Sequence, residues 1–302
     1  MNRRKHTMKV GFIGLGIMGR PMAEHMVKAG LDVMVSDLNE KIVAELVAEG
    51  ATAGSNKDLA EQCDVVEMIL PNASIVKNVI FGEGGLMDYM KAGQIVVDHS
   101  SVTANDSREC YEKLQEKGIG FLDAPVSGGE SGAKAGTLVI MVGGDEKDFN
   151  TCAPIFDTYS SQATLIGDSG SGSICKLANQ IIVNNNIAIV AEALTFAAKA
   201  GVDPEKVYKA IEGGAARSYA LEDKAPMMVE RNFTPGGTIK VNHKDITNVI
   251  NTAHAIDCPI PYTAQLYEIQ QTMKAHGHME EDHAAYVKYF ETLADTIVEK
   301  KN

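Results

Sequence analysis

Lys176 is the residue in this sequence whose surroundings most call for a chemical explanation. It stands near the start of SICKLANQIIVNNNIAIVAEA (residues 173–193), and fifteen uncharged residues separate it from Glu192. A helix this apolar and amide-rich should be buried on most sides, where an ammonium group is costly. A lysine there suits general acid–base chemistry, which requires a pKa lowered from about 10.4 towards ~7–8 by burial and by the helix N-terminus. The alternative is an ordinary surface lysine at a helix start.

A glycine loop, GLGIMG, forms the second chemical feature. It lies between a predicted strand, KVGFIG, and a predicted helix, GRPMAEHMVKAG. Gly14 permits a tight turn, Gly16 lets the backbone approach a pyrophosphate, and Gly19 lets strand and helix pack closely. Asp37 ends the next strand, eighteen residues after Gly19, where a carboxylate binds ribose hydroxyls. The combination predicts a dinucleotide site. Asp37 would repel a 2′-phosphate, so NAD is favoured, and NADP stays open because Lys41 could reach round.

The elements that position these groups alternate between strand and helix through the first half of the chain. Apolar runs predict strands at residues 9–14, 32–37, 65–70, 94–100, 120–126, 136–144 and 162–170, with amphipathic helices at 19–30, 39–50 and 103–118. This rhythm predicts a doubly wound parallel sheet with helices on both faces. The strands lack clean alternation, as expected when both faces of a sheet are buried.

From about residue 171 onward only helical periodicity is present. Helices are predicted at residues 173–200, 204–213, 218–230, 242–256, 262–276 and 280–299. We therefore expect an α/β fold with two domains. An N-terminal Rossmann-type domain occupies residues 1–168, and an all-α substrate and oligomerisation domain that begins with a long helix occupies residues 169–302.

Composition narrows the class of protein. The formal net charge is −12, with 45% hydrophobic and 23% charged residues, so we expect neither nucleic acid nor membrane as a partner. The basic N-terminus followed by an apolar run flows into a strand–helix unit, so it is interpreted as a lead before the first strand and not as a signal peptide. The helix at residues 173–193 carries five Asn or Gln residues and a lysine, which argues against a membrane span.

The cysteines and histidines offer no metal site by spacing. The eight histidines form no convincing i, i+4 pair, and the five cysteines are scattered without a C-x-x-C motif. An odd set of scattered cysteines predicts reduced thiols and a cytoplasmic location. The cysteines are Cys63, Cys110, Cys152, Cys175 and Cys258.

Three further segments make a family resemblance specific. They are FLDAPVSGGESGAKAGTLVIMVGG (121–144), GSGSICKLANQ (170–180) and HKDI (243–246). With the glycine loop, in this order and spacing, the chain resembles the β-hydroxyacid dehydrogenase family from residue 9 to near the C-terminus. The resemblance implies an NAD(P)-dependent oxidoreductase that acts on CH–OH groups and forms a dimer or tetramer.

The resemblance also implies roles for the residues of these segments. Lys176 would protonate the alkoxide that forms as hydride reaches an aldehyde, and would accept the hydroxyl proton in reverse. Ser127, Gly128 and Gly129 match a loop that binds the substrate carboxylate, with a plain turn as the alternative. Asn179 and Gln180 share the face of Lys176 and would contact substrate and hold the lysine, with amides that cap a helix contact as the alternative. Many family members carry Asn at the second position. Arg217 would clamp a distal carboxylate or else serve as a solvated loop charge.

Cofactor binding is expected from the glycine loop, from the end of the second strand and from matching positions elsewhere. Lys244 matches a lysine near the nicotinamide, with Asp245 as its orienting partner, and a surface helix charge is the alternative. The expected cofactor-binding residues are Gly14, Gly16, Ile17, Met18, Gly19, Asp37, Leu38, Asn39, Leu70, Pro71, Asn72, Thr103 and Lys244.

The implied substrate is a short semialdehyde that bears a carboxylate. Five segments resemble those of family members that reduce tartronate semialdehyde to glycerate: AEQCDVV, KLANQIIV, AIEGGAA, KAPMMVERNFTPG and DHAAYVKYFETLA. The segments ARSYALEDK and SDLNE favour 2-(hydroxymethyl)glutarate instead. 3-Hydroxyisobutyrate, glyoxylate and succinic semialdehyde are further alternatives. A non-catalytic, dinucleotide-sensing scaffold on the same fold is the alternative from another class.

Overall fold

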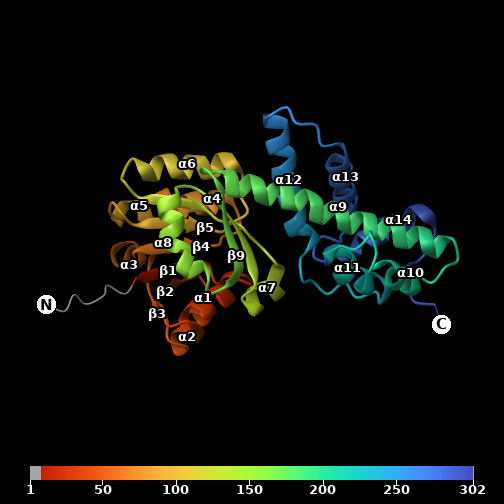
Figure 1. Cartoon of the computed structure of the whole chain (residues 1–302), viewed down its shortest axis with the longest axis horizontal. Helices are drawn as coiled ribbons and strands as arrows, with labels where there is room; N and C mark the ends of the chain where they lie inside the picture. The colour runs from red at the N-terminus through yellow and green to blue at the C-terminus, as the bar shows by residue number, and fades with distance from the viewer. Residues whose placement is uncertain (1–7, 302) are drawn as a thin grey trace. The chain divides into compact units, whose positions relative to one another are not determined.

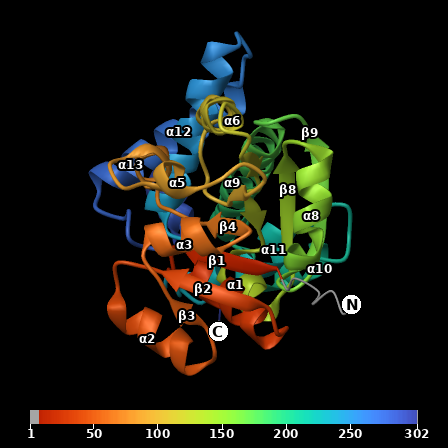
Figure 2. The same ribbon diagram turned by 90° about the vertical axis from the view of Figure 1, so that its left-hand side faces the viewer.

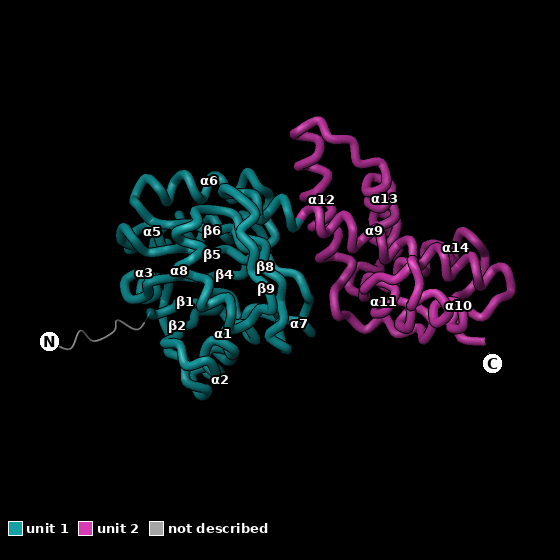
Figure 3. Tube along the Cα trace, viewed as in Figure 1, with its two compact units in different colours: residues 1–176 teal, residues 177–302 magenta. Residues whose placement is uncertain are grey.

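The chain consists of two compact units, residues 1–176 and 177–302, drawn in separate colours in Figure 3. A computed structural model describes residues 8–301, so most of the predicted basic lead lies outside the described residues. The division falls inside the long helix α9 (Ser171–Lys199). The domain boundary predicted at residues 168–169 lies just before this helix, whose first turns contact the first unit.

The first unit is built on one sheet whose strands run in the order β3-β2-β1-β4-β5-β6-β8-β7, with β9 paired to β8. All pairs from β3 to β6 are parallel, whereas β8 is antiparallel to β6 and β7. The strands are β1 (Lys9–Ile13), β2 (Asp32–Ser36), β3 (Thr52–Ala53), β4 (Val65–Met68), β5 (Ile95–Asp98), β6 (Gly120–Asp123), β7 (Val126–Ser127), β8 (Leu138–Gly143) and β9 (Ser160–Gly167).

The antiparallel strand β8 is the exception within the doubly wound parallel sheet expected from the sequence. Its connection from β7 consists of residues 128–137, which hold only the short helix α7 (Gly129–Ala135). A parallel crossover needs a dozen residues or more, so a connection of this length favours an antiparallel return. The remainder of the sheet has the predicted doubly wound parallel arrangement.

Helices cover both faces of the sheet, as Figures 1 and 2 show. One buried cluster contains residues from the helices α1 (Gly19–Lys28), α2 (Glu40–Ala48), α7 and α8 (Glu146–Phe156). The second cluster contains residues from α3 (Asn56–Gln62), α4 (Ala73–Phe81), α5 (Leu86–Tyr89) and α6 (Ala104–Gln115).

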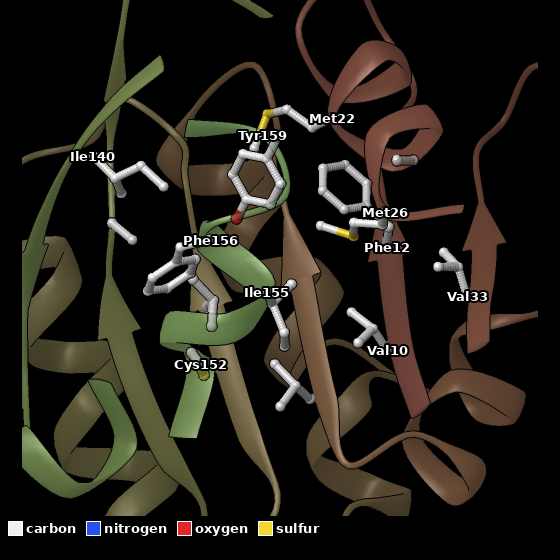
Figure 4. Packing of buried hydrophobic residues seen from close by; sticks show 14 of the residues in the cluster. Val10, Phe12, Met22, Met26, Val33, Ile140, Cys152, Ile155, Phe156 and Tyr159 are labelled. Atoms are coloured by element: carbon white, nitrogen blue, oxygen red, sulfur yellow. The ribbon is translucent and has the colours of Figure 1, made fainter. Parts of the chain in front are cut away.

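Adjacent residues of one strand belong to different clusters, because their side chains point to opposite faces of the sheet. Val10 and Phe12 of β1 belong to the first cluster and Ile13 to the second. In the first cluster Met22 and Met26 of α1 lie near Phe12 (Figure 4). Both faces of each central strand are therefore buried, which explains the strands' lack of an apolar–polar alternation.

The second unit is helical throughout its described part. It contains most of α9, then α10 (Pro204–Ile211), α11 (Tyr219–Val229), α12 (Ile239–Ala255), α13 (Pro261–Ala275), a 3₁₀ turn η1 (His283–Tyr286) and α14 (Val287–Ala294). The single helix predicted at residues 280–299 is wrong. Asp282 caps η1 through Ala284 N, and α14 ends where Asp295 adopts φ +46°. The all-α class of this unit is confirmed.

Helix α9 is long and apolar enough to cross a membrane by length and composition, and 44% of its most apolar window is buried within the protein. Its buried residues include Ile187, Leu194 and the polar Asn184. A buried asparagine and a partly buried apolar face are typical of a core helix in a globular domain. Three apolar side chains remain exposed at seven-residue spacing: Ile182, Ile189 and Phe196.

Candidate active site

The glycine loop joins β1 to α1 and has the geometry that each glycine was expected to provide. Gly14 has φ +94°, and a Cβ there would lie 2.4 Å from Ile69 O. A Cβ on Gly19 would lie 1.9 Å from Gly14 O, so strand, loop and helix meet without room for a side chain. A Cβ on Gly16 would meet nothing within 4 Å. The loop therefore has a bare backbone face at the N-terminus of α1, which fits a pyrophosphate.

Asp37 follows β2 and holds the glycine loop in place. Its Oδ2 accepts a hydrogen bond from Leu15 N at 2.6 Å, and its Oδ1 accepts one from Asn39 N at 2.7 Å. Asn39 in turn caps α2 through Lys41 N. Each carboxylate oxygen has a second lone pair, so these bonds are compatible with ribose binding. Leu38 is fully exposed beside this carboxylate.

The other expected cofactor residues of the first unit lie after β4 and β5. Asn72 caps α4 through Ile75 N at 3.0 Å, and Thr103 caps α6 in a capping box with Asp106. Leu70 N donates to Ser100 Oγ at 2.8 Å. The carboxyl ends of parallel strands share one edge of the sheet, so these residues lie at the same edge as the glycine loop. Their described side-chain bonds are helix caps.

Lys176 and the predicted carboxylate loop are brought together within the first unit. Lys176 Nζ donates a hydrogen bond to Val126 O at 2.8 Å, and the side chain is half-buried. Val126 directly precedes Ser127, and the next two residues have φ +134° (Gly128) and +62° (Gly129). These backbone conformations favour glycine and turn the chain sharply beside the lysine. The ammonium group is thus held one residue from the loop expected to bind substrate.

In the second unit, Gln180 connects the other expected site residues. Gln180 Nε2 donates to Asp245 Oδ2 at 2.6 Å, and Asn179 Nδ2 donates to Gln180 Oε1 at 3.0 Å. Lys244 Nζ lies 3.3 Å from Asp245 Oδ1, so the expected pairing of these two neighbours is present. Gln180 and Asp245 are both buried. A shorter Asn at position 180 would not reach the carboxylate without a shift of the backbone.

The chain is similar to known proteins along almost its whole length. Residues 9–167 match the family described as the NAD-binding domain of 6-phosphogluconate dehydrogenase, and residues 170–290 match the NAD-binding family of NADP-dependent 3-hydroxyisobutyrate dehydrogenase. The chain is 41% identical to 2-hydroxy-3-oxopropionate reductase of Escherichia coli K12, over 95% of this chain and 99% of the relative. It is 38% identical to 2-(hydroxymethyl)glutarate dehydrogenase of Eubacterium barkeri, over 97% and 98%.

A solved structure shows the same fold. The 3-hydroxyisobutyrate dehydrogenase of Salmonella typhimurium superimposes with a TM-score of 0.84 at 32% identity, over 93% of this chain and 99% of that one. The chain belongs to the β-hydroxyacid dehydrogenase family.

Membership of the β-hydroxyacid dehydrogenase family makes the chain an NAD(P)-dependent oxidoreductase that acts on the CH–OH group of small hydroxy acids. The named activities of its relatives differ, since L-threonate dehydrogenase of Cupriavidus necator is also 30% identical over 94% of this chain. Family membership therefore establishes the type of reaction but does not identify the substrate.

Arg217, expected either to clamp a distal carboxylate or to be a loop charge, lies just before α11. Its side chain is 69% exposed, and its Nε donates to Glu222 Oε1 at 2.6 Å. This partner raises the pKa of the guanidinium. In this β-hydroxyacid dehydrogenase an incoming carboxylate would share an exposed guanidinium with Glu222, so the contacts favour the loop-charge interpretation.

A fully buried polar cluster that was not expected from the sequence lies on the α8 face of the sheet. Tyr159 OH donates to Glu67 Oε2 at 2.9 Å, and His99 Nε2 lies 3.2 Å from the same oxygen. His99 Nδ1 donates to Ala124 O at 2.7 Å. Burial alone would lower the pKa of His99, but the hydrogen bond and charge of Glu67 outweigh it and raise that pKa. A glutamate inside the apolar run VVEMIL was the available sequence signal.

Asp123 was also overlooked. It is the last residue of β6 and is buried, and its carboxylate accepts hydrogen bonds from Gly170 N and Ser173 N at the start of α9. The available signal was a single acidic residue that ends the apolar run GFLD.

No metal centre is evident in the described part of the chain. Among residues 8–301, no three His, Cys, Asp or Glu side chains are grouped so that they could hold a metal ion. The described cysteines are free thiols, and burial raises the pKa of both Cys63 and Cys110 to about 12. Buried thiols of this kind are inert as nucleophiles.

Proposed function

We propose that the chain reduces tartronate semialdehyde (2-hydroxy-3-oxopropanoate) to D-glycerate with NADH. The observation that carries the proposal is the 2.8 Å hydrogen bond from Lys176 Nζ to Val126 O, which sets the lysine beside the Ser127–Gly129 loop. The identity of 41% with the Escherichia coli reductase along almost the whole chain supports the choice of substrate.

Residues of the first unit have separate roles in the proposed reaction: one transfers a proton and others bind the substrate carboxylate. NADH held by the glycine loop would supply a hydride for the aldehyde carbon. Lys176 donates a proton to the carbonyl oxygen as negative charge develops there, so that the aldehyde becomes a primary alcohol; in the reverse direction it accepts that proton. The Ser127 hydroxyl and the N–H groups of Gly128 and Gly129 bind the carboxylate without adding net charge to the site.

NAD is the cofactor that Asp37 favours. A carboxylate bound to the backbone at the end of β2 accepts hydrogen bonds from ribose hydroxyls and repels a 2′-phosphate. We assign the loop residues Gly14 and 16–19, the segments 37–39 and 70–72, and Thr103 to the cofactor site, and Lys244 to the nicotinamide. Asn179 and Gln180 are assigned to the substrate, with Asp245 orienting both Gln180 and Lys244 through its two oxygens.

Oxidation of 2-(hydroxymethyl)glutarate is the second candidate, because that dehydrogenase is 38% identical over 97% of this chain. Its substrate has a distal carboxylate that tartronate semialdehyde lacks. Binding of that group by Arg217 would place a second carboxylate beside Glu222 on one exposed guanidinium. This crowding of like charges and the lower identity are the reasons for ranking it second.

The test compares NADH oxidation by the purified chain with tartronate semialdehyde and with 2-formylglutarate under identical conditions. A clear preference for the first substrate supports the proposal, and a preference for the second replaces it with the hydroxymethylglutarate activity.

Lys176→Ala should lower kcat by about two or more orders of magnitude and leave NADH affinity near normal. Near-full activity of this variant contradicts the role of the lysine, and NADH binding without turnover of either aldehyde favours the scaffold alternative.

We further propose that the chain is a cytoplasmic homo-oligomer, a dimer or tetramer, assembled through its helical unit. The exposed apolar side chains of Ile182, Ile189 and Phe196 on one long helix support this assignment. Light scattering of the full chain measures the oligomeric state, and a monomer at micromolar concentration would contradict it.

A further inference from the structure

The start of α9 is bound to the end of β6 by one buried carboxylate. Asp123 Oδ1 accepts a hydrogen bond from Gly170 N at 2.7 Å, and Oδ2 accepts one from Ser173 N at 2.8 Å. Asp123 is only 1% exposed. The first N–H groups of a helix have no partners within the helix, and Asp123 satisfies one of them from a different element. We call this arrangement the Asp123 clamp.

Glycines allow the helix to come close enough for the clamp to form. A Cβ on Gly172 would lie 2.4 Å from both Asp123 O and Met141 O. A Cβ on Gly143 would lie 2.6 Å from Asp123 Oδ1. Both distances are shorter than any ordinary carbon contact, so the first turn of α9 packs directly against strand backbone. The position of this turn is consequently defined on several sides.

A third contact fixes the rotation of the same turn. Ser173 Oγ lies 3.0 Å from Ser107 Oγ of α6, and both side chains are buried. Ser173 therefore contacts Asp123 through its backbone N–H, and its hydroxyl contacts both Ser107 and the Asp123 carboxylate. A rotation of α9 about its axis would break both contacts.

The clamp and the lysine act on one short stretch of chain. Lys176 follows Ser173 by three residues, and Val126, whose carbonyl accepts from Lys176 Nζ, follows Asp123 by three residues. The segment 123–126 thus contacts α9 twice, first at the helix start and then at the ammonium group. Displacement of the first turn by about 1 Å would move Nζ relative to the Ser127 loop, and errors of that size can cost ~100-fold in rate.

We propose that Asp123 is a positioning residue for Lys176, which sets the ammonium group against the substrate loop by fixing the first turn of α9. The proposal rests on the proposed function, in which Lys176 transfers the proton. A purely structural anchor would instead lower thermal stability and leave the chemistry of the folded enzyme unchanged.

Asp123→Asn is the sharpest test because it keeps the size of the side chain. The amide retains one acceptor and turns an N–H₂ group towards either Gly170 N or Ser173 N, which both donate. At a temperature well below unfolding, kcat should fall ~10- to 100-fold, while the dissociation constant for NADH stays within about twofold. Acetylation of the Lys176 amine by acetic anhydride, followed by mass spectrometry without substrate, should accelerate about threefold or more because Val126 O no longer holds it.

Asp148→Asn is the matched control. Asp148 is also a buried aspartate of the first unit, and it lies in the first turn of α8. It is beside Gly120 at the beginning of β6, whereas Asp123 is at the end of that strand. This control should leave kcat, NADH affinity and the acetylation rate of Lys176 unchanged. Equal effects of the two substitutions would overturn the proposal, because they would reflect general loss of a buried carboxylate.

The outcomes separate this proposal from the proposed function. Unchanged kcat and unchanged acetylation in Asp123→Asn, with Lys176→Ala inactive, overturn the positioning role alone. Full activity of Lys176→Ala overturns the proposed function, and the acetylation rate still decides whether Asp123 holds the lysine. If Asp123→Asn does not fold, Ser173→Ala removes the hydroxyl that contacts Ser107 and also hydrogen-bonds the Asp123 carboxylate. It should change kcat and acetylation in the same directions by about two- to fivefold, and no change in either contradicts the proposal.

Discussion

Replacement of Asp98 by asparagine should change the pH dependence of stability in a calculable way. Asp98 ends β5 in register with Asp123, is buried, and accepts a hydrogen bond from Ser100 N at 2.9 Å. Burial raises its pKa to about 6, against the opposing effects of the Ser100 hydrogen bonds and of His99. The unfolded chain should have the ordinary aspartate pKa of about 3.9.

The sign follows from proton binding. Between pH ~3.9 and ~6 the folded state holds the Asp98 proton more tightly than the unfolded state, so stability falls as pH rises through this window. Below the window the carboxyl is neutral in both states and nothing is lost. Above it, ionised Asp98 costs about 3 kcal/mol, since each pKa unit corresponds to about 1.4 kcal/mol. About 2 kcal/mol of this cost appears between pH 4.5 and 8.

The assay is urea unfolding of the wild type and of Asp98→Asn at pH values from 4.5 to 8. Circular dichroism is the suitable probe because the chain has no tryptophan. Relative to the wild type, the variant should gain about 2 kcal/mol of stability as pH rises across this range. Asp157→Asn, the same substitution at an exposed aspartate of the same unit, should show a constant difference. A constant difference for Asp98→Asn as well would refute the raised pKa of the Asp98 carboxyl in the folded chain.

Three further substitutions test other parts of the structure. Gly19→Ala places a Cβ 1.9 Å from Gly14 O and should weaken NADH binding about 10-fold or more, measured by cofactor fluorescence; unchanged affinity would mean that this loop does not bind the pyrophosphate. Arg217→Ala should keep kcat/KM for tartronate semialdehyde within about twofold, because an exposed ion pair contributes little, and a 10-fold loss would make Arg217 a substrate residue. Tyr159→Phe removes a buried hydrogen bond to Glu67 and should cost ~1–3 kcal/mol in urea unfolding; no loss would show that the cluster contributes nothing to stability.

Local chemistry was enough to predict one part of the candidate site. Gly14 and Gly19 lie where the turn and the helix packing exclude side chains. A strand–glycine–helix pattern in a sequence predicts this exclusion. Lys176 was recognisable because the helix that carries it is otherwise uncharged near its start. Its contact with Val126 O joins residues fifty positions apart, and only the family resemblance linked these two segments beforehand.

Features that depend on tertiary contacts were beyond the sequence patterns. The direction of β8 depends on the short connection through α7, and a helical period at residues 280–299 does not reveal the caps that Asp282 and Asp295 form. Asp123 and Glu67 each occur singly in apolar strands, where a lone carboxylate has no visible partner. Their partners are supplied by α9 and by Tyr159, which lie far along the chain.

The contiguity of the first unit has a consequence for synthesis on the ribosome. The whole sheet is encoded by residue 167, and the Asp123 clamp is complete once Ser173 has emerged. Domains tend to fold as units, the N-terminal one first, during translation. The nascent chain can therefore finish its sheet and fix the start of α9 while most of the helical unit is still being made, so a ribosome stalled well after Lys176 should already display a protease-resistant first unit.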